Sequence, residues 1–251
     1  MNNIIKKEEE FWDNKAGNKI KYYRDLINTP DEKIYKLTFF MLSLLGGVGD
    51  KNILDLGCGY GGNSCFLAKK GAKVSAIDIS SKNIEQAKKW CAKNSVTVDV
   101  KKMQCEKLDF PDNYFDFVVG SFVLHHVDIE KTSKEIGRVL KKGGKAVFVE
   151  TFSTSGLLMF FRDKILKLLG SRKNSPGEYP LTVEKIKKSE AYLGRPVVYT
   201  KEMVFFRLAA SYFFKDNHFA RKYFSAIDDF FYKYIPKSRN LSYYKIIEFS
   251  K

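Results

Sequence analysis

The feature that most constrains the fold of this chain is a glycine-rich turn between two apolar runs. The segment from Asn52 to Gly62 reads N-I-L-D-L-G-C-G-Y-G-G, and the second run, Val74 to Asp78, ends in a carboxylate. The apolar residues before the glycines are typical of a strand buried on both faces. Gly57, Gly59 and Gly61 carry no Cβ where the backbone must turn and approach a ligand. We therefore expect a strand and a ligand-binding turn in immediate succession.

The second run places its carboxylate at a spacing that suits a nucleoside ligand. Asp78 lies nineteen residues after Gly59, close to the offset of roughly 20 residues at which an acid accepts hydrogen bonds from ribose hydroxyls. The stretch from Asn63 to Lys70 is compatible with a helix, whose first free N–H groups would face the ligand. A glycine turn alone also occurs in α/β proteins without a ligand. Together with Asp78, however, it indicates an adenosine-bearing cofactor.

The middle of the chain alternates between helix and strand patterns. The expected helices cover residues 34–45, 81–93, 129–140, 157–169 and 185–192, and the expected strands cover residues 52–56, 74–77, 96–103, 115–120 and 145–150. Such alternation implies a parallel sheet with helices on both faces. Ligands of these sheets lie beyond the carboxyl ends of the strands, where we expect Gly59, Asp78, Gln104 and Ser121.

Two further segments strengthen the interpretation of the glycine turn. Leu108-Asp-Phe-Pro-Asp-Asn-Tyr-Phe-Asp-Phe-Val-Val119 and Arg138-Val-Leu-Lys-Lys-Gly-Gly144 stand where the fourth and fifth strands begin. With the turn that starts at Asp55, they resemble the class I, Rossmann-like S-adenosylmethionine-dependent methyltransferases, and within them the type 11 methyltransferase domain family. The resemblance covers about residues 50 to 151.

The resemblance implies an α/β fold built on a doubly wound, mostly parallel seven-stranded sheet with an antiparallel edge hairpin. The last two strands are expected at residues 196–199 and 242–249. The implied single domain has an amino-terminal helical lid in residues 1–50, a cofactor-binding core in residues 51–151, and a substrate cap with the last two strands in residues 152–251. The implied cofactor is S-adenosyl-L-methionine, with S-adenosyl-L-homocysteine as product.

The resemblance also assigns roles to individual residues. It implies that the turn at Asp55 holds the methionine end of the cofactor, that Asp78 holds the ribose and that Ile79 lies against adenine. Gln104 stands where relatives carry an aspartate that accepts from the adenine amino group, and a glutamine carbonyl can accept the same hydrogen bond. The expected cofactor-binding residues are Asp55, Gly57, Cys58, Gly59, Asp78, Ile79, Gln104, Cys105 and Ser121.

Aromatic residues near the amino terminus match a lid element of the family. Trp12, Tyr22 and Tyr23 are the candidates to fold over the cofactor. The alternative, that these rings only dock the amino-terminal helices, remains open. Later in the chain an aromatic and basic insertion, from Phe205 to Tyr234, is expected to shape the acceptor pocket, unless its rings only pack helices onto the sheet.

Two adjacent histidines, His125 and His126, follow the fourth expected strand. Imidazole titrates near neutral pH, so either side chain could take a proton from a methyl acceptor. Because neighbouring side chains of an extended segment point to opposite sides, we expect only one to face the transferred methyl group. The alternative, that both histidines only order this loop, remains open.

The charge of the chain favours anionic partners without choosing among them. The sequence holds 44 Lys and Arg against 29 Asp and Glu, which gives a net charge of +15. Arg162, Arg172 and Arg207 could meet a phosphate or carboxylate of the acceptor. No apolar run reaches the about 18 residues of a membrane span and no apolar signal core is present, so we expect a cytoplasmic protein. Neither the cysteine spacing nor the three histidines predict a metal site.

The sequence therefore predicts a methyltransferase that methylates a small, anionic or aromatic molecule at oxygen. RNA methylation is an alternative that the charge favours, although Ser121-Phe-Val-Leu replaces the N/D-P-P-Y/F signature of base amino methylation. A membrane-associated methyltransferase of a lipid or quinone-like substrate is a second alternative, in which the cap contacts the bilayer. A non-catalytic protein that keeps the cofactor fold is a third.

Overall fold

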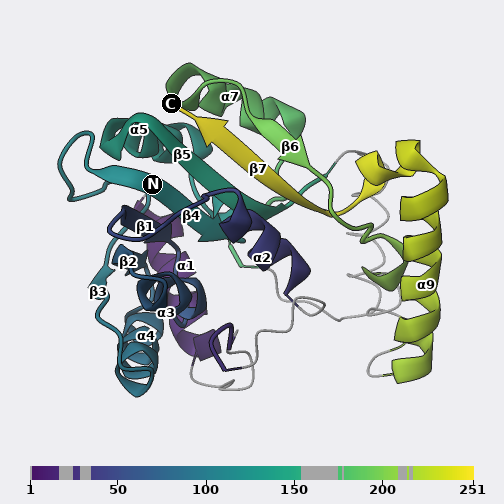
Figure 1. The fold of residues 1–251 in the computed structure, drawn as a ribbon, viewed down its shortest axis with the longest axis horizontal. Coiled ribbons are helices and arrows are strands. Elements are labelled where there is room, and N and C mark those ends of the chain that lie inside the picture. The colour runs from purple at the N-terminus through teal and green to yellow at the C-terminus, as the bar shows by residue number, and fades with distance from the viewer. Residues whose placement is uncertain are drawn as a thin grey trace.

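A seven-stranded sheet with the strand order β3-β2-β1-β4-β5-β7-β6 forms the centre of the molecule (Figure 1). The computed structural model describes residues 2–16, 25–28, 35–153, 175–176, 178–208, 214 and 217–251. The strands are β1 Asn52–Leu56, β2 Lys73–Asp78, β3 Asp99–Lys102, β4 Phe115–Ser121, β5 Leu140–Thr151, β6 Val197–Tyr199 and β7 Tyr244–Ser250. Strands β1 to β5 pair in parallel, whereas β7 runs antiparallel to both β5 and β6. The predicted sheet with its antiparallel edge is confirmed.

Helices cover both faces of this sheet because its strands alternate their side chains. In β5, Phe148 faces the same core as α5 and α7, whereas Val147 and Val149 face the core under α2 and α3. This alternation is the two-residue period of a pleated strand. The helices are α1 Asn2–Ala16, α2 Lys36–Ser43, α3 Gly62–Lys69, α4 Ser81–Lys93, α5 Ile129–Val139, α7 Val183–Leu193 and α9 His218–Tyr234, with 3₁₀ turns η2 Leu124–His126 and η3 Pro236–Leu241.

Side-chain caps set the starts of four helices. In each case a Ser, Thr, Asp or Asn side chain accepts a hydrogen bond from the backbone N–H three residues later, which satisfies one of the free donors of the first turn. The caps are Ser80 for α4, Asp128 for α5, Thr182 for α7 and Asn217 for α9. Helix α3 instead starts after Gly61, which has φ 79°.

The structure differs from the predicted elements mainly in length. Strand β5 begins at Leu140, five residues before its expected start, because α5 passes directly into it and Leu140 pairs with Phe115. Strand β3 is confined to four residues, Asp99–Lys102. A further helix, expected at residues 157–169, lies outside the described residues, as do Arg162 and Arg172.

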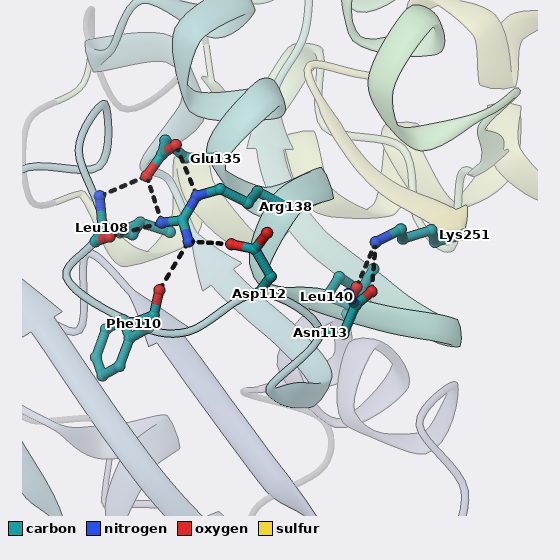
Figure 2. A network of polar contacts seen from close by, with 8 residues as sticks. All are labelled: Leu108, Phe110, Asp112, Asn113, Glu135, Arg138, Leu140 and Lys251. Carbon is teal, nitrogen blue, oxygen red and sulfur yellow. Dashed lines mark hydrogen bonds and ion pairs between the residues drawn. The ribbon is translucent and has the colours of Figure 1, made fainter.

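Arg138 joins the two segments that frame β4 (Figure 2). Its guanidinium donates to the carbonyl oxygens of Phe110 (2.8 Å) and Leu108 (2.7 Å) and to the carboxylates of Asp112 and Glu135, both at 2.8 Å. Glu135 in turn accepts from the Leu108 N–H at 2.8 Å. The hydrogen bonds from Arg138 hold the pKa of Glu135 below its usual range, although burial opposes them. One planar side chain thus fixes the turn before β4 to helix α5.

Replacing Arg138 by Met should lower the free energy of unfolding by about 1–3 kcal/mol, because two buried carbonyl oxygens and Glu135 lose charged donors. Urea denaturation measures the loss. A matched control is Lys89→Met, which breaks the exposed pair with Glu85 and should cost much less, because water screens such a pair. Equal losses in the two variants would contradict a structural role for the Arg138 network.

Candidate functional site

The candidate site lies beyond the carboxyl ends of the parallel strands. Gly59, Asp78, Gln104 and Ser121 follow or end β1, β2, β3 and β4, which is where the sequence places them. Strand pairing puts Leu56 beside Ile77 and Gly120. The turns that leave β1, β2 and β4 are therefore neighbours in space.

The glycine turn is fastened to the end of β2 by backbone and carboxylate hydrogen bonds. Cys58 N–H donates to the Ile77 carbonyl at 2.8 Å, and Gly59 N–H donates to Asp78 Oδ2 at 2.9 Å. Gly57 and Gly59 have φ 65° and 53°, a left-handed conformation that favours glycine. The turn is consequently held open at the carboxyl ends of the strands.

Asp78 is buried and serves as the central acceptor of this turn. Besides Gly59, it accepts at Oδ1 from the Ser80 N–H (2.9 Å) and from Asn83 Nδ2 (3.2 Å). Burial raises the pKa of the Asp78 carboxyl above its ordinary value, and these three donors oppose the rise. A carboxylate offers about four acceptor positions. The arrangement therefore leaves Asp78 Oδ2 room for one further donor.

The first turn of helix α3 binds polar side chains of β1 and β4. Ser64 Oγ donates to Asp55 Oδ2 at 2.5 Å, and Asn63 Nδ2 donates to Ser121 Oγ at 3.2 Å. Asp55, Asn63 and Ser64 are all buried. The first turn of α3 is thereby tied both to the end of β1 and to the end of β4.

An open groove lies beside the ends of β2 and β3. Its volume is about 450 Å³. Ile79 supplies an apolar wall and Gln104 an amide, and the side chains that line it are Glu9, Ile79, Lys102, Met103, Gln104 and Lys107. The adjoining Cys105 is buried, and burial raises the pKa of its thiol. The groove thus combines apolar, amide and charged side chains, and its apolar and amide part suits a flat heteroaromatic ring.

Helix α1 makes polar contacts with the start of α4 and with the end of β3. Asp13 Oδ1 accepts from Ser80 Oγ at 2.6 Å and from the Lys82 N–H at 3.1 Å. Although burial opposes them, these hydrogen bonds hold the pKa of Asp13 below its ordinary value. Glu9 pairs with Lys102 at 2.5 Å. The start of α4 is therefore capped by its own Ser80, at the Asn83 N–H, and by Asp13 of α1, at the Lys82 N–H.

Trp12 extends the contacts of α1 to the histidines. Its ring lies edge-on to His126 with centroids 5.2 Å apart, and its Nε1 donates to Glu8 at 3.0 Å. Tyr22 and Tyr23, the other two residues of the predicted lid, lie outside the described residues. The division of the chain into lid, core and cap stays a prediction.

A buried carboxylate organises the loop after β4. Glu150 of β5 is fully buried, and its Oε1 accepts from the N–H groups of Val123 (2.8 Å) and Leu124 (2.7 Å). Its Oε2 lies 2.7 Å from His125 Nδ1. Phe122 has φ 59°, a strained conformation for a bulky side chain. The loop turns back at Phe122 and closes over Glu150.

The two histidines do not point to opposite sides. They lie in the 3₁₀ turn η2, and their rings are in contact with centroids 4.0 Å apart. The expected extended geometry is wrong because the His126 N–H donates to the Val123 carbonyl and closes the turn. His126 Nδ1 contacts Ser175 Oγ at 2.9 Å and lies 3.8 Å from Glu8. His125 and His126 therefore have different partners.

Val123 packs between the cofactor-side turn and β4. A Cβ at Gly57 would lie 2.6 Å from Val123 Cγ2, and a Cβ at Gly120 would lie 2.8 Å from Val123 Cγ1. Only residues without a Cβ permit this approach on both sides. The loop that carries His125 and the turn that carries Gly59 consequently share one side chain.

Sequence reasoning missed three residues that organise this arrangement, Glu150, Val123 and Asp13. Glu150 and Val123 become important only because the loop after β4 folds back onto β5, and Asp13 only because α1 docks on α4. A glutamate directly after the apolar run V-F-V was the one available signal for Glu150. Arg207, a candidate for anion binding, is instead paired with Glu202 at 2.7 Å.

Comparison with known proteins identifies what this arrangement resembles. A family model described as a methyltransferase domain matches residues 54–148. A ubiquinone biosynthesis O-methyltransferase from Pelagibacter ubique is 34% identical over 166 residues, which cover 61% of this chain and 67% of that protein. A ubiquinone/menaquinone biosynthesis C-methyltransferase from Chromobacterium violaceum is 30% identical over 182 residues, covering 68% of this chain and 73% of that protein.

A solved structure shows that the similarity of fold extends over nearly the whole chain. The geranyl diphosphate C-methyltransferase of Streptomyces coelicolor, determined with Mg²⁺, geranyl diphosphate and S-adenosyl-L-homocysteine, superposes with a TM-score of 0.68 at 16% identity, covering 98% of this chain and 97% of that one. Other curated relatives match over less of their length. For four of them, this chain spans only 31% to 46% of the relative's own sequence.

Two further properties concern only the described part of the chain. It contains no group of three or more His, Cys, Asp or Glu side chains that could hold a metal ion. None of its helices is sufficiently long and apolar to cross a bilayer.

Gly57→Ala should destabilise the protein by about 1–3 kcal/mol, because the new methyl group collides with Val123 and alanine disfavours the positive φ. In a double-mutant cycle, Val123→Ala should remove the closest contact, at Cγ2, although its Cβ stays 2.9 Å from the new methyl group. The collision is then relieved in part, so the two single losses should add to more than the double variant shows. Urea denaturation provides the three values.

Gly59→Ala is the matched control for this cycle. It has the same sign of φ, but a Cβ there meets no atom within 4 Å, so its coupling to Val123→Ala should be close to zero. Equal coupling for Gly57 and Gly59 would show that Val123 does not form the predicted contact.

Proposed function

This chain belongs to the class I S-adenosylmethionine-dependent methyltransferases, and we propose that it transfers a methyl group from this cofactor to a hydroxyl of a small-molecule acceptor. The single observation that carries the proposal is the pairing of an open cofactor turn with a carboxylate-bound histidine, both beyond the carboxyl ends of the central strands. The Glu150–His125 pair lies next to the turn through Val123. The neighbouring loops thus supply cofactor binding and proton removal.

The residues at the strand ends fit the cofactor. Asp78 Oδ2 has room for one ribose hydroxyl, which is fewer than the two that a free diol would offer. Ile79 and Gln104 line the groove and would receive adenine between an apolar wall and an amide. The glycine turn and Asp55 would hold the methionine end. Gly57 and Gly59 keep this approach free of Cβ atoms.

His125 is the histidine better placed to act as a base. Glu150 Oε1 already accepts two backbone N–H groups, so the carboxylate serves as an acceptor and the proton of the neutral ring lies on Nδ1. The lone pair of Nε2 is then available, and among the described residues Nε2 has no hydrogen-bond partner. This is the geometry by which a carboxylate orients a catalytic imidazole.

The chemistry that these residues must support is a displacement at carbon. When bound, the cofactor would supply an electrophilic methyl group on a sulfonium, and its sulfur would keep the bonding electron pair. The protein aligns the acceptor oxygen with that methyl group, and His125 Nε2 accepts the hydroxyl proton as the oxygen–carbon bond forms. His125 then carries the proton until solvent removes it. The net charge of the reacting groups is balanced throughout.

The names of the relatives support an aromatic hydroxyl as acceptor. One relative is an O-methyltransferase and the other a C-methyltransferase of quinone biosynthesis. Removing a phenolic proton activates both the oxygen and the ring carbons beside it, so the same base would serve either outcome. Transfer to carbon of a quinone-like acceptor is therefore the second candidate function.

Calorimetry with purified protein tests the cofactor. S-adenosylmethionine and S-adenosylhomocysteine should bind and NAD should not, and Asp78→Asn should weaken binding by about tenfold or more, as expected for losing a charged acceptor. Affinity should fall as the pH decreases through the raised pKa of Asp78, because the protonated carboxyl no longer accepts from both Gly59 and ribose. The Asp78→Asn variant should lack this pH dependence. Preference for NAD would overturn the proposal.

Variants of the histidine pair test the base in an assay with phenolic acceptors. His125→Ala should lower turnover about 10²-fold or more, whereas His126→Ala should affect it less. Glu150→Gln keeps a carbonyl acceptor for the backbone N–H groups but presents an NH₂ to His125 Nδ1, which shifts the ring proton to Nε2. Turnover should fall while cofactor affinity stays unchanged, and nitrogen NMR should report the changed tautomer. Full activity of His125→Ala would exclude a histidine base at this position.

A further inference from the structure

Helix α9 carries a stripe of exposed aromatic side chains. Phe219, Tyr223, Phe230 and Tyr234 are 84%, 67%, 54% and 61% exposed. Their spacing of four, seven and four residues, with exposed Ala226 between them, places them on one face of a helix of 3.6 residues per turn. These four rings are called the α9 stripe below. From Phe219 to Tyr234 they extend along the helix for about 22 Å.

The opposite face of α9 is already used to fix the helix to the rest of the protein. Asp228 is fully buried and accepts from the backbone N–H groups of residues 205–207, and Tyr232 Oη donates to the Thr200 carbonyl at 3.2 Å. Burial raises the pKa of the Asp228 carboxyl, and the three N–H donors oppose this rise. Since this face is fixed, the stripe cannot turn inward to join the core.

Basic residues accompany the rings on the exposed side. Lys222 and Lys233 are exposed and directly precede Tyr223 and Tyr234, and exposed Lys237 follows the helix. Asp229 is the exposed acid of the helix among the described side chains. Lysines can extend along apolar rings while keeping the ammonium in a polar layer. The exposed face therefore combines aromatic surface with positive charge.

We propose that the α9 stripe docks the protein on a lipid bilayer with anionic headgroups. An aromatic and basic helix face lies in the interfacial plane of a bilayer, with its rings at the acyl boundary and its lysines among the headgroups. Figure 1 shows α9 standing beside the sheet, apart from the helices that cover its two faces. In that position the helix can contact a flat surface along its length.

The charge pattern favours a bilayer over the two other possible partners. A second copy of the chain would place like-charged lysines opposite one another across a twofold interface, in a protein whose net charge is +15. An RNA strand requires a basic groove that follows its backbone with rings for single bases, whereas the stripe is the convex side of one helix. An anionic membrane satisfies the rings and the lysines together.

The docked helix would also place the site near the lipid. Helix α9 continues through η3 to the start of β7, where Tyr244 pairs with Thr151 at the end of β5, one residue after Glu150. This step rests on the proposed function: an acceptor dissolved in the bilayer would enter from that side. The class of acceptor is then a lipid-soluble phenol or quinol.

Flotation of the full-length protein with vesicles tests the docking. The protein should float with vesicles of phosphatidylcholine and phosphatidylglycerol, and less with phosphatidylcholine alone. The double variant Phe230→Ser/Tyr234→Ser should bind the mixed vesicles at least about tenfold more weakly, because each ring loses its apolar burial. Lys222→Glu/Lys233→Glu should also weaken binding. The matched control, Lys88→Glu/Lys93→Glu on α4, changes the net charge by the same amount. This control should bind the mixed vesicles more tightly than the Lys222→Glu/Lys233→Glu variant.

Four outcomes would overturn the docking: no flotation of the wild type, equal flotation of the α9 aromatic variant, a dimer that this variant converts to monomers, or RNA binding that this variant loses. Calorimetric binding of S-adenosylhomocysteine by the same variants keeps the two proposals separate. It should be unchanged, since the stripe lies outside the cofactor groove. Loss of flotation with intact cofactor binding would leave the proposed methyltransferase function in place.

Discussion

The loop after β4, with its two histidines, depends on one buried carboxylate. Glu150 lies near the end of β5 and accepts from two backbone N–H groups of the loop after β4 while it holds His125. An ionised carboxylate without water is tolerated in a protein interior only when it has such donors. The loop in turn cannot move without leaving that charge uncompensated. The position of the histidine is therefore set by the sheet and not by the loop sequence alone.

The parts of this molecule that were predictable from the sequence are those decided by local chemistry. Glycines at positive φ, the spacing from Gly59 to Asp78 and the alternation of apolar residues each act within one or two elements. The alternation of strands with helices and the polar groups at strand ends followed from them, whereas the antiparallel edge was expected only from the resemblance to a family. The partners of these groups did not, because they depend on residues far apart in the chain that meet only when the sheet is complete.

The loop with the two histidines shows this limit most clearly. Nothing in S-F-V-L-H-H indicates that Phe122 adopts a left-handed conformation, so an extended run was the natural expectation. The turn forms because Glu150 binds Val123 and Leu124 from the next strand and because the two missing Cβ atoms at Gly57 and Gly120 make room for Val123. Arg138 gives the converse lesson. A motif that identifies the family works here as a structural fastening, remote from any reacting atom.

Val123 has a consequence for how such a protein could change during evolution. Its isopropyl group touches the glycine turn on one side and β4 on the other, and its N–H is held by Glu150. A mutation that enlarged or shifted it to suit a new acceptor would at once disturb the turn on the cofactor side. New acceptor preferences are therefore more accessible through segments that do not share this contact. The sequences of the cofactor turn and of the loop beside it are therefore expected to change together or to stay nearly constant. Residues that do not contact Val123 can vary more freely.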